Sequence, residues 1–218
     1  MPARARRSAG CRAAAHNIGV TIPHPQLDLW EPDFRTRLVA RAEDRFAWLK
    51  ARARGVTGTD VARFTSEKAL RAVAMEKLLG SGFGGNAFTE HGKAREPEIA
   101  KWVRARHGII PSSGLYHAHG EPLHLATPDG LVVRDGTVLL AEIKTTQHAW
   151  RSIPRSYLRQ VWWQQYVLGA ERTLVVWEQH RDFVPIEREP QCRWVDRDEN
   201  EIHVLVSLAD RLLELMRR

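Results

Sequence analysis

The stretch 127-TPDGLVVRDGTVLLAEIKTT-146 carries an acidic residue, Asp129, after a proline, and the triplet Glu142-Ile143-Lys144 in the next apolar run. Two neighbouring strands joined by a short turn would bring the Asp129 and Glu142 carboxylates together. Side chains alternate along a strand, so Lys144 points to the same face as Glu142. Two carboxylates on one face are ligands for a hard divalent cation such as Mg²⁺. With a lysine to orient or stabilise an attacking water, they form the minimal set for metal-assisted phosphodiester hydrolysis.

Each of these charged residues also has a purely structural explanation. Pro-Asp-Gly is an ordinary turn sequence, and taken alone the turn explains Asp129 better than a site does. Pro128 cannot donate to a sheet ladder, which predicts a kinked or bulged strand that aims Asp129 out of the pleat. Glu142 and Lys144 would fit a solvent-facing edge strand. The apolar run 138–141 before them instead predicts a central strand buried on both faces, and charges at the end of such a strand indicate function.

A third carboxylate is expected from the helix predicted at about 88–107. Glu96 is the candidate near its start, and Glu90 and Glu98 compete with it on the same segment. The alternative is an acid in the first turns that the helix dipole stabilises. The residues alone do not choose among the three.

Two glutamines, Gln160 and Gln164, lie four residues apart in the helix predicted at about 155–168 and share one face. Near a metal site a glutamine positions a water or a phosphate. Without further information, a solvated helix face is the favoured explanation for both. Trp162 and Trp163 in the same helix are expected in the core.

Four residues surround a turn that opens a helix: Arg52, Arg54, Thr57 and Thr59. Backbone amides at a helix start, together with hydroxyls and a guanidinium, make a phosphate site. A plain helix N-cap explains the threonines as well. Both interpretations stay open at this point.

The 218-residue chain has 33 Lys and Arg against 26 Asp and Glu, a formal net charge of +7. Such a surplus suggests a polyanionic partner, of which nucleic acid is the commonest, although a basic protein without such a partner shows it too. No long linker divides the middle, so residues 28–218 are expected to form a single domain.

Cysteines and apolar runs exclude several classes of protein. Only Cys11 and Cys192 occur, so a disulfide framework is not expected and a reducing cytoplasm fits. No Cys-x-x-Cys pair supplies ligands for a zinc ribbon or an iron–sulfur cluster. No apolar run approaches the roughly 20 residues that span a bilayer, so no membrane association is expected.

Residues 1–27 contain four arginines and no acid. This composition partly matches an organelle transit peptide. A flexible basic tail that touches nucleic acid without sequence preference is the interpretation we favour.

The order of predicted elements indicates the fold class. Helices come first, then a strand meander, then helix, strands and helix, which predicts an α/β (α+β) fold with a central mixed sheet flanked by helices. The predicted helices cover about 33–52, 66–79, 88–107, 155–168 and 201–217. The predicted strands cover about 108–111, 114–117, 123–127, 130–134, 138–144, 172–178 and 183–187, and a loop is expected at 80–86.

Five stretches occur together and in order: WLKARARGVTGTD, HGKARE, ATPDGL, AEIKT and YLRQVWWQQYV. With them the chain resembles the lambda-type (YqaJ-like) phage recombination exonucleases of the PD-(D/E)XK nuclease superfamily, from about Trp48 to Val167. The resemblance implies a restriction-endonuclease-like core. The tail at 1–27 has no counterpart in it, and Thr59 stands where some members have serine.

The resemblance assigns a role to each candidate. It implies that Asp129 and Glu142 are the principal metal ligands, with the Ile143 carbonyl as a backbone ligand, and that Lys144 is the catalytic lysine. Glu96 falls at the place of the family's helical carboxylate. Tyr157 and Gln160 match the family's Tyr-x-x-Gln helix. Arg52 and Thr59 resemble the residues that hold the terminal 5′-phosphate of the DNA, and Thr57 beside them is also expected to bind substrate.

The implied activity is a Mg²⁺-dependent deoxyribonuclease, with Mn²⁺ as an alternative ion, that degrades one strand of double-stranded DNA ends from 5′ to 3′. The implied partners are a single-strand annealing protein and further copies of the chain, assembled as a trimeric ring. The implied location is the cytoplasm, which is that of the bacterial host if the protein is phage-encoded. Rivals are an endonuclease or a CRISPR-adaptation or repair nuclease of the same superfamily, and a catalytically silent DNA-binding module.

Overall fold

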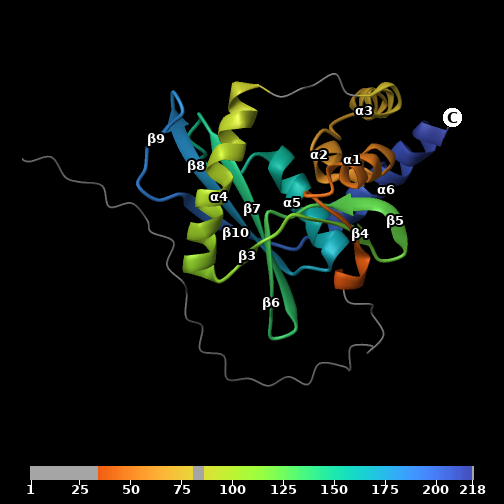
Figure 1. Ribbon diagram of the computed structural model, residues 1–218. Helices are drawn as coiled ribbons and strands as arrows, with labels where there is room; N and C mark the ends of the chain where they lie inside the picture. Colours follow the sequence, from red (N-terminus) through yellow and green to blue (C-terminus); the bar gives the residue numbers. More distant parts are fainter. Residues whose placement is uncertain (1–33, 81–85, 218) are drawn as a thin grey trace, which may run out of the picture.

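A computed structural model of the chain describes residues 34–80 and 86–217 (Figure 1). The predicted tail at 1–27 lies outside the described residues, as does most of the loop predicted at 80–86. The described part has two β-sheets with helices around them, so the predicted mixed α/β class is confirmed.

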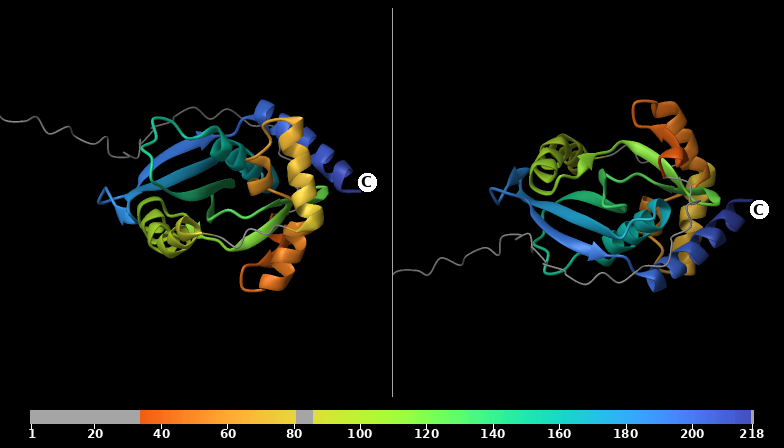
Figure 2. Two further views of the ribbon diagram at one scale, coloured as in Figure 1. Left: turned by 90° about the horizontal axis from the view of Figure 1, so that it is seen from above. Right: turned by 90° about the horizontal axis from the view of Figure 1, so that it is seen from below.

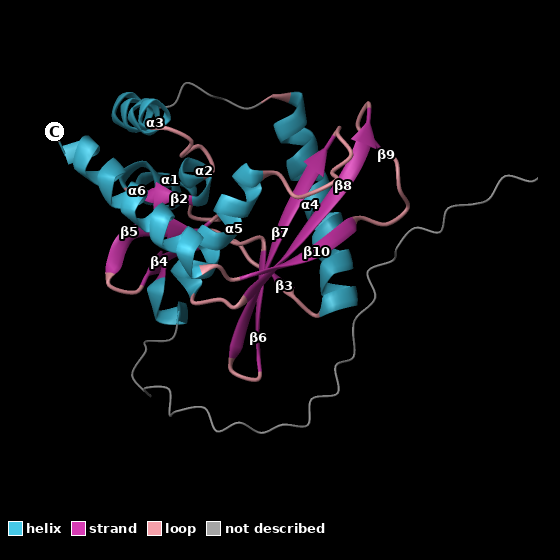
Figure 3. Ribbon diagram, turned by 180° about the vertical axis from the view of Figure 1, so that it is seen from behind, coloured by secondary structure: helices cyan, strands magenta, loops and turns pink. Residues whose placement is uncertain are grey.

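The larger sheet has six strands and carries the sequence stretch 127–146. Its order is β10-β8-β7-β6-β3, with β9 paired to β8. β7 and β8 are parallel and the other pairs are antiparallel, so the sheet is mixed. Figure 3 shows the β6–β7 hairpin extending away from the helices. The strands are β3 (Ile110–Pro111), β6 (Gly130–Arg134), β7 (Thr137–Thr146), β8 (Arg172–Arg181), β9 (Val184–Pro185) and β10 (Gln191–Asp196).

A smaller four-stranded sheet has the order β1-β4-β5-β2. Its β2 pairs parallel to β5, and its other pairs are antiparallel. The strands are β1 (Leu38–Arg41), β2 (Val56–Thr57), β4 (Gly114–Ala118) and β5 (Glu121–Ala126).

Helices cover the large sheet from two sides. The α4 residues Ile99 and Val103 pack on Ala141 and Val176 of the sheet, whereas α5 packs against its opposite face through Val161. Figure 2 shows α4 and α5 on opposite sides of the strands. The helices are η1 (Phe34–Arg37, a 3₁₀-helix), α1 (Arg45–Arg54), α2 (Gly58–Val61), α3 (Glu67–Leu79), α4 (Ala87–His107), α5 (Arg155–Leu168) and α6 (Glu199–Arg217).

The prediction of one helix over 33–52 is wrong. A 3₁₀ turn, strand β1 and helix α1 occupy this segment, and the Asp44 carboxylate caps α1 by accepting from the Ala47 N–H at 3.1 Å. The apolar spacing was misleading because Phe46 is 78% exposed, so α1 has no buried face. The pairing of β1 with β4 determines the backbone conformation of this segment. The Arg37 guanidinium, just before β1, also holds the segment on β4 by donating to the carbonyl oxygen of His117 at 2.6 Å.

Three further expectations need correction. β10 and the two-residue β2 were not predicted, and the strand expected at 183–187 is only Val184–Pro185. Pro128 does not bulge a strand, because it lies in the connection where the chain passes from β5 in the small sheet to β6 in the large one. Edge strands such as β10 are half exposed, which leaves little apolar alternation to detect. Within the described ranges, no helix is long and apolar enough to cross a membrane.

Gly55 lies between α1 and β2, where atoms of β5 leave no room for a side chain. A Cβ at this position would lie 2.6 Å from the Leu123 carbonyl oxygen and 2.5 Å from Leu125 Cδ1. We expect Gly55→Ala to lower the free energy of unfolding by about 1–3 kcal/mol, as overpacking does. Denaturant unfolding measures this. Gly92→Ala is the control, since its Cβ would meet Thr145 Oγ1 at an ordinary 3.4 Å; an equal stability of the two variants would contradict the prediction.

Candidate active site

The β6–β7 hairpin brings Asp129 and Glu142 together, as the sequence predicts. The register pairs Gly130 with Ala141, so Asp129, one residue earlier, comes opposite Glu142. The Ile143 N–H donates to Asp129 Oδ2 at 2.6 Å, which ties the connection between the sheets to β7.

Glu142 is buried, with 1% of its surface exposed, although it lies in the middle of β7. Its two carboxylate oxygens have different partners. Oε1 forms an ion pair with the Lys144 ammonium, and Oε2 accepts from Gln164 Nε2 at 2.7 Å. The buried charge is therefore compensated from both sides.

Lys144 lies between acids and an aromatic ring. Its Nζ is 5.2 Å from the centre of the Tyr157 ring, a cation–π distance. Tyr157 packs on Trp150, which stacks on the buried Trp177 at 5.1 Å between ring centres. Burial alone would lower the pKa of Lys144, but Glu142 and Asp129 outweigh it and raise this pKa. Lys144 is therefore a cation at neutral pH, suited to stabilise negative charge and not to accept a proton.

Glu96 comes from a different element, α4, and joins the same electrostatic neighbourhood. Burial and then the Glu142 charge raise the pKa of Glu96. Burial and then Glu142 also raise the pKa of Asp129 well above its usual range, with a smaller contribution from Glu96. The Glu142 charge thus disfavours the ionised forms of Glu96 and Asp129, and the Lys144 ammonium group lies near these acids.

Carboxylates crowded in this way suit a hard divalent cation, since oxygen donors are its preferred ligands and its charge relieves their repulsion. Within residues 34–80 and 86–217, no three His, Cys, Asp or Glu side chains are already grouped closely enough to hold a metal ion. The acids fit a divalent cation by donor type and charge, but their side chains are not grouped as a ligand set, and Lys144 is paired to Glu142.

A cleft of about 550 Å³ opens beside these residues. Six predicted site residues line it together, namely Thr59, Glu96, Ile143, Lys144, Tyr157 and Gln160, whereas Asp129 and Glu142 are not part of its lining. The cleft also contains the cations Arg63 and Lys93, which sequence reasoning did not select. Residues of α2, α4, β7 and α5 thus line one cleft that carries both basic and acidic side chains. The cleft is large enough to hold part of a nucleotide.

Comparisons with known proteins show the family of this chain. The family model described as a YqaJ-like viral recombinase domain matches residues 47–171, more than half of the chain. The protein belongs to this family. A search of curated proteins found no match.

Solved structures share the fold of this YqaJ-like domain. LHK-Exo, an alkaline exonuclease from Laribacter hongkongensis crystallised in complex with dAMP, is 21% identical, with a TM-score of 0.62 over 78% of this chain and 91% of that one. A phage-related exonuclease from Haemophilus somnus 129PT is 15% identical, with a TM-score of 0.58 over 74% of this chain and 93% of that one. These likenesses confirm the predicted PD-(D/E)XK core.

Two of the predicted phosphate residues of the YqaJ-like domain lie outside the cleft lining. The Arg52 guanidinium stacks over the Trp48 ring at 4.3 Å. The Thr57 N–H and hydroxyl both donate to Asp60 Oδ2 at 2.7 Å, and Lys77 Nζ contacts the same oxygen at 2.9 Å. This geometry makes Thr57 a helix cap, the alternative that the sequence left open, whereas the exposed Thr59 faces the cleft.

The sequence named Gln164 beside Gln160 but gave it no role at the site. Its spacing of four from Gln160 placed both glutamines on one helix face, but only the fold shows that Gln164 is buried against Glu142 while Gln160 lines the cleft. Arg95 was also missed; it anchors α4 to β8 through hydrogen bonds of 2.8 and 2.6 Å to Glu178.

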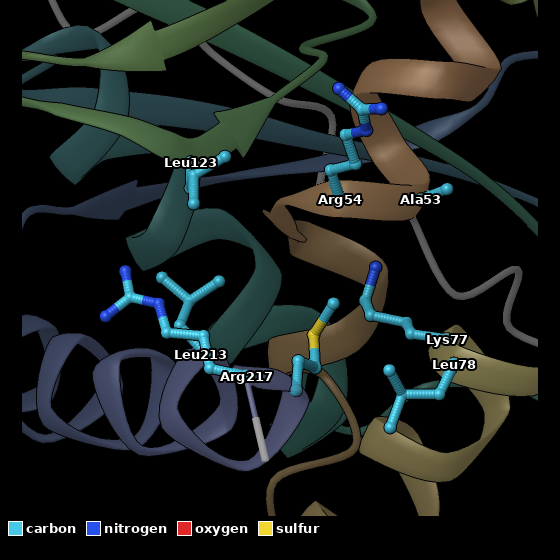
Figure 4. Close-up of a pocket in the computed structure, with 8 residues that line it drawn as sticks. Ala53, Arg54, Lys77, Leu78, Leu123, Leu213 and Arg217 are labelled. Atoms are coloured by element: carbon cyan, nitrogen blue, oxygen red, sulfur yellow. The ribbon is translucent and has the colours of Figure 1, made fainter.

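A second pocket, of about 350 Å³, lies apart from the acids between α1, α3, β5 and α6 (Figure 4). Leu123, Leu213 and Met216 form much of its wall, and Arg54 and Arg217 add charge. It contains none of the carboxylates of the candidate site.

Asp129→Asn should stabilise the metal-free protein at alkaline pH. Because the pKa of Asp129 is raised on folding, the folded chain holds this proton more tightly than the unfolded chain. The free energy of unfolding therefore falls as pH rises from the ordinary aspartate range through the raised pKa. The variant lacks this loss, so we expect its Tm in EDTA at pH 8 to be higher by on the order of 2–4 °C, about 1 kcal/mol. The gain should disappear near pH 4; a Tm at pH 8 no higher than that of the wild type would contradict the expectation.

Proposed function

We propose that this protein is a metal-dependent 5′-to-3′ exodeoxyribonuclease that degrades one strand of linear double-stranded DNA for recombination by strand annealing. The proposal is carried by Asp129 and Glu142, which contact the cleft-lining residues Ile143 and Lys144, and by Glu96, which lines the same cleft. Family membership supports the general part of this assignment, that the protein is a nuclease that hydrolyses phosphodiester bonds.

Asp129, Glu142 and Glu96, with the Ile143 carbonyl, would hold Mg²⁺ or Mn²⁺. When bound, such an ion lowers the pKa of water and offsets the charge on a phosphate. Lys144, a persistent cation beside Glu142, stabilises negative charge that develops on the scissile phosphate.

The remaining candidates bind and orient the DNA. Gln160 lines the cleft on α5 and is placed to hydrogen-bond a phosphate or the attacking water. Thr59, in the cleft lining at the start of α2, and Arg52, which stacks on Trp48 outside that lining, would hold the terminal 5′-phosphate. Tyr157 would support the strand beside Lys144. Thr57 supports this pocket as the cap of α2. LHK-Exo in its complex with dAMP is a precedent for a nucleotide in a protein of this fold.

The positive surplus of the chain supports duplex binding without sequence preference, which weakens steeply as salt rises. The protein would act as a homo-oligomer, a trimeric ring by analogy with the lambda-type exonucleases. A single-strand annealing protein would take up the 3′ strand, and the reaction would take place in the cytoplasm.

A comparison of linear and circular DNA tests the activity. With Mg²⁺, linear duplex carrying 5′-phosphates should be degraded, while covalently closed circles survive. Lys144→Ala should reduce the cleavage rate by roughly 10²–10³-fold, as loss of one transition-state donor does, with DNA binding retained in a gel-shift assay.

Cutting of closed circles would instead identify an endonuclease. Binding without cleavage at any Mg²⁺ or Mn²⁺ concentration would identify a silent DNA-binding module. Turnover by Lys144→Ala at the wild-type rate would remove the catalytic role of the lysine.

Arg52→Ala tests end recognition. We expect the preference for 5′-phosphate over 5′-hydroxyl ends to fall by about tenfold or more, since a charged hydrogen bond contributes about 1.5–3 kcal/mol. The ratio of the two rates is the measurement, because loss of packing on Trp48 affects both substrates alike. Lys50→Ala, which removes an exposed cation from the same helix, is the matched control; an unchanged ratio in Arg52→Ala would show that the phosphate pocket lies elsewhere.

A further inference from the structure

The Glu142 carboxylate is held from two directions, and only one partner lies in the cleft. Oε1 pairs with Lys144, which lines the cleft, whereas Oε2 accepts from Gln164 Nε2 in the interior. Gln164 itself is buried, with 1% of its surface exposed. It therefore reaches Glu142 from behind and does not touch the contents of the cleft.

Gln164 is anchored to both acid-bearing segments. Its Nε2 also lies 3.5 Å from the carbonyl oxygen of Thr127, two residues before Asp129. The adjacent Trp163 fixes the helix by donating from Nε1 to the Leu125 carbonyl oxygen at 2.9 Å. One amide group thus bridges the connection that carries Asp129 and the strand that carries Glu142.

The orientation of this amide suits an ionised acid. A carboxylate only accepts hydrogen bonds, so its neighbour must present N–H and not oxygen. A donor on Oε2 restricts rotation of the carboxylate and keeps Oε1 directed towards Lys144, which lines the cleft. Such a partner matters most for a side chain that is buried, since an uncompensated carboxylate there is costly.

We propose that Gln164 is a positioning residue that fixes the Glu142 carboxylate for divalent-cation binding. The proposal rests on the proposed function, in which Glu142 is a ligand. Loss of a hydrogen-bonded partner behind a metal ligand typically weakens metal affinity or activity by about 10–100-fold. We expect the same scale for Gln164.

The chain offers a matched control in the next residue. Gln165 is equally buried on the same helix, but its Nε2 donates to Thr173 Oγ1 at 3.1 Å and to the Val195 carbonyl oxygen at 3.0 Å. Replacing either glutamine by methionine removes one buried amide of similar size. Only Gln164→Met removes the donor to Glu142.

The experiment measures Mn²⁺ binding to the full-length, DNA-free protein by isothermal titration calorimetry, so that it does not depend on turnover. Gln164→Met should raise the Mn²⁺ Kd by about tenfold or more, and Gln165→Met should keep it within about twofold of the wild type. In cleavage assays, Gln164→Met should need correspondingly more Mn²⁺ for half-maximal rate, with the KM for DNA unchanged. If Gln164→Met does not fold, Gln164→Asn replaces it, since the shorter side chain cannot span the 2.7 Å contact.

The outcomes separate this inference from the proposed function. A wild type that binds Mn²⁺ and cleaves linear DNA, beside a Gln164→Met with the same Kd, overturns the role of Gln164 alone. Equal weakening in the Gln164 and Gln165 variants also overturns it, because the effect is then one of general stability. A wild type that neither binds Mn²⁺ nor cleaves DNA overturns both proposals.

Discussion

The burial of a charged carboxylate in the middle of β7 is the constraint on which the rest of the site depends. Glu142 is surrounded by an apolar strand and by the helices that pack on the large sheet. A charge in such a place is costly unless it is paired and hydrogen-bonded. Lys144 and Gln164 supply the two partners, and they come from the same strand and from the helix behind it.

This arrangement explains why elements distant in the sequence must meet. Asp129 is tied to β7 through the Ile143 N–H, α5 delivers Gln164, and α4 delivers Glu96 while Arg95 fixes that helix to β8. The cost of crowding acids is visible in the raised pKa values of Glu96 and Asp129, due first to burial and then to Glu142. Stability lost by gathering like charges is common at sites that bind a cation.

Local pattern predicted the elements that their own residues specify. The helices expected at about 66–79, 88–107, 155–168 and 201–217 are present as α3, α4, α5 and α6, and the strands expected on either side of a short turn form the β6–β7 hairpin. The segment 33–52 was mispredicted because the pairing of β1 with β4 overrides a helical spacing that buries nothing. β10 was missed because its half-exposed residues lack alternation, and β8 across the sheet provides the pairing that makes it a strand.

The sequence by itself determined the kinds of groups at the site and their order: Glu96, Asp129, Glu142 and Lys144 stand within motifs that indicate one chemistry, and alternation along β7 places the last two on one face. Only the tertiary structure decided which side chains touch. It set Gln164, and not Gln160, against Glu142, and it committed the Thr57 hydroxyl to Asp60. The physical reason is that burial and contact between α5 and β7 arise from packing across the fold, which spacing along one helix does not specify.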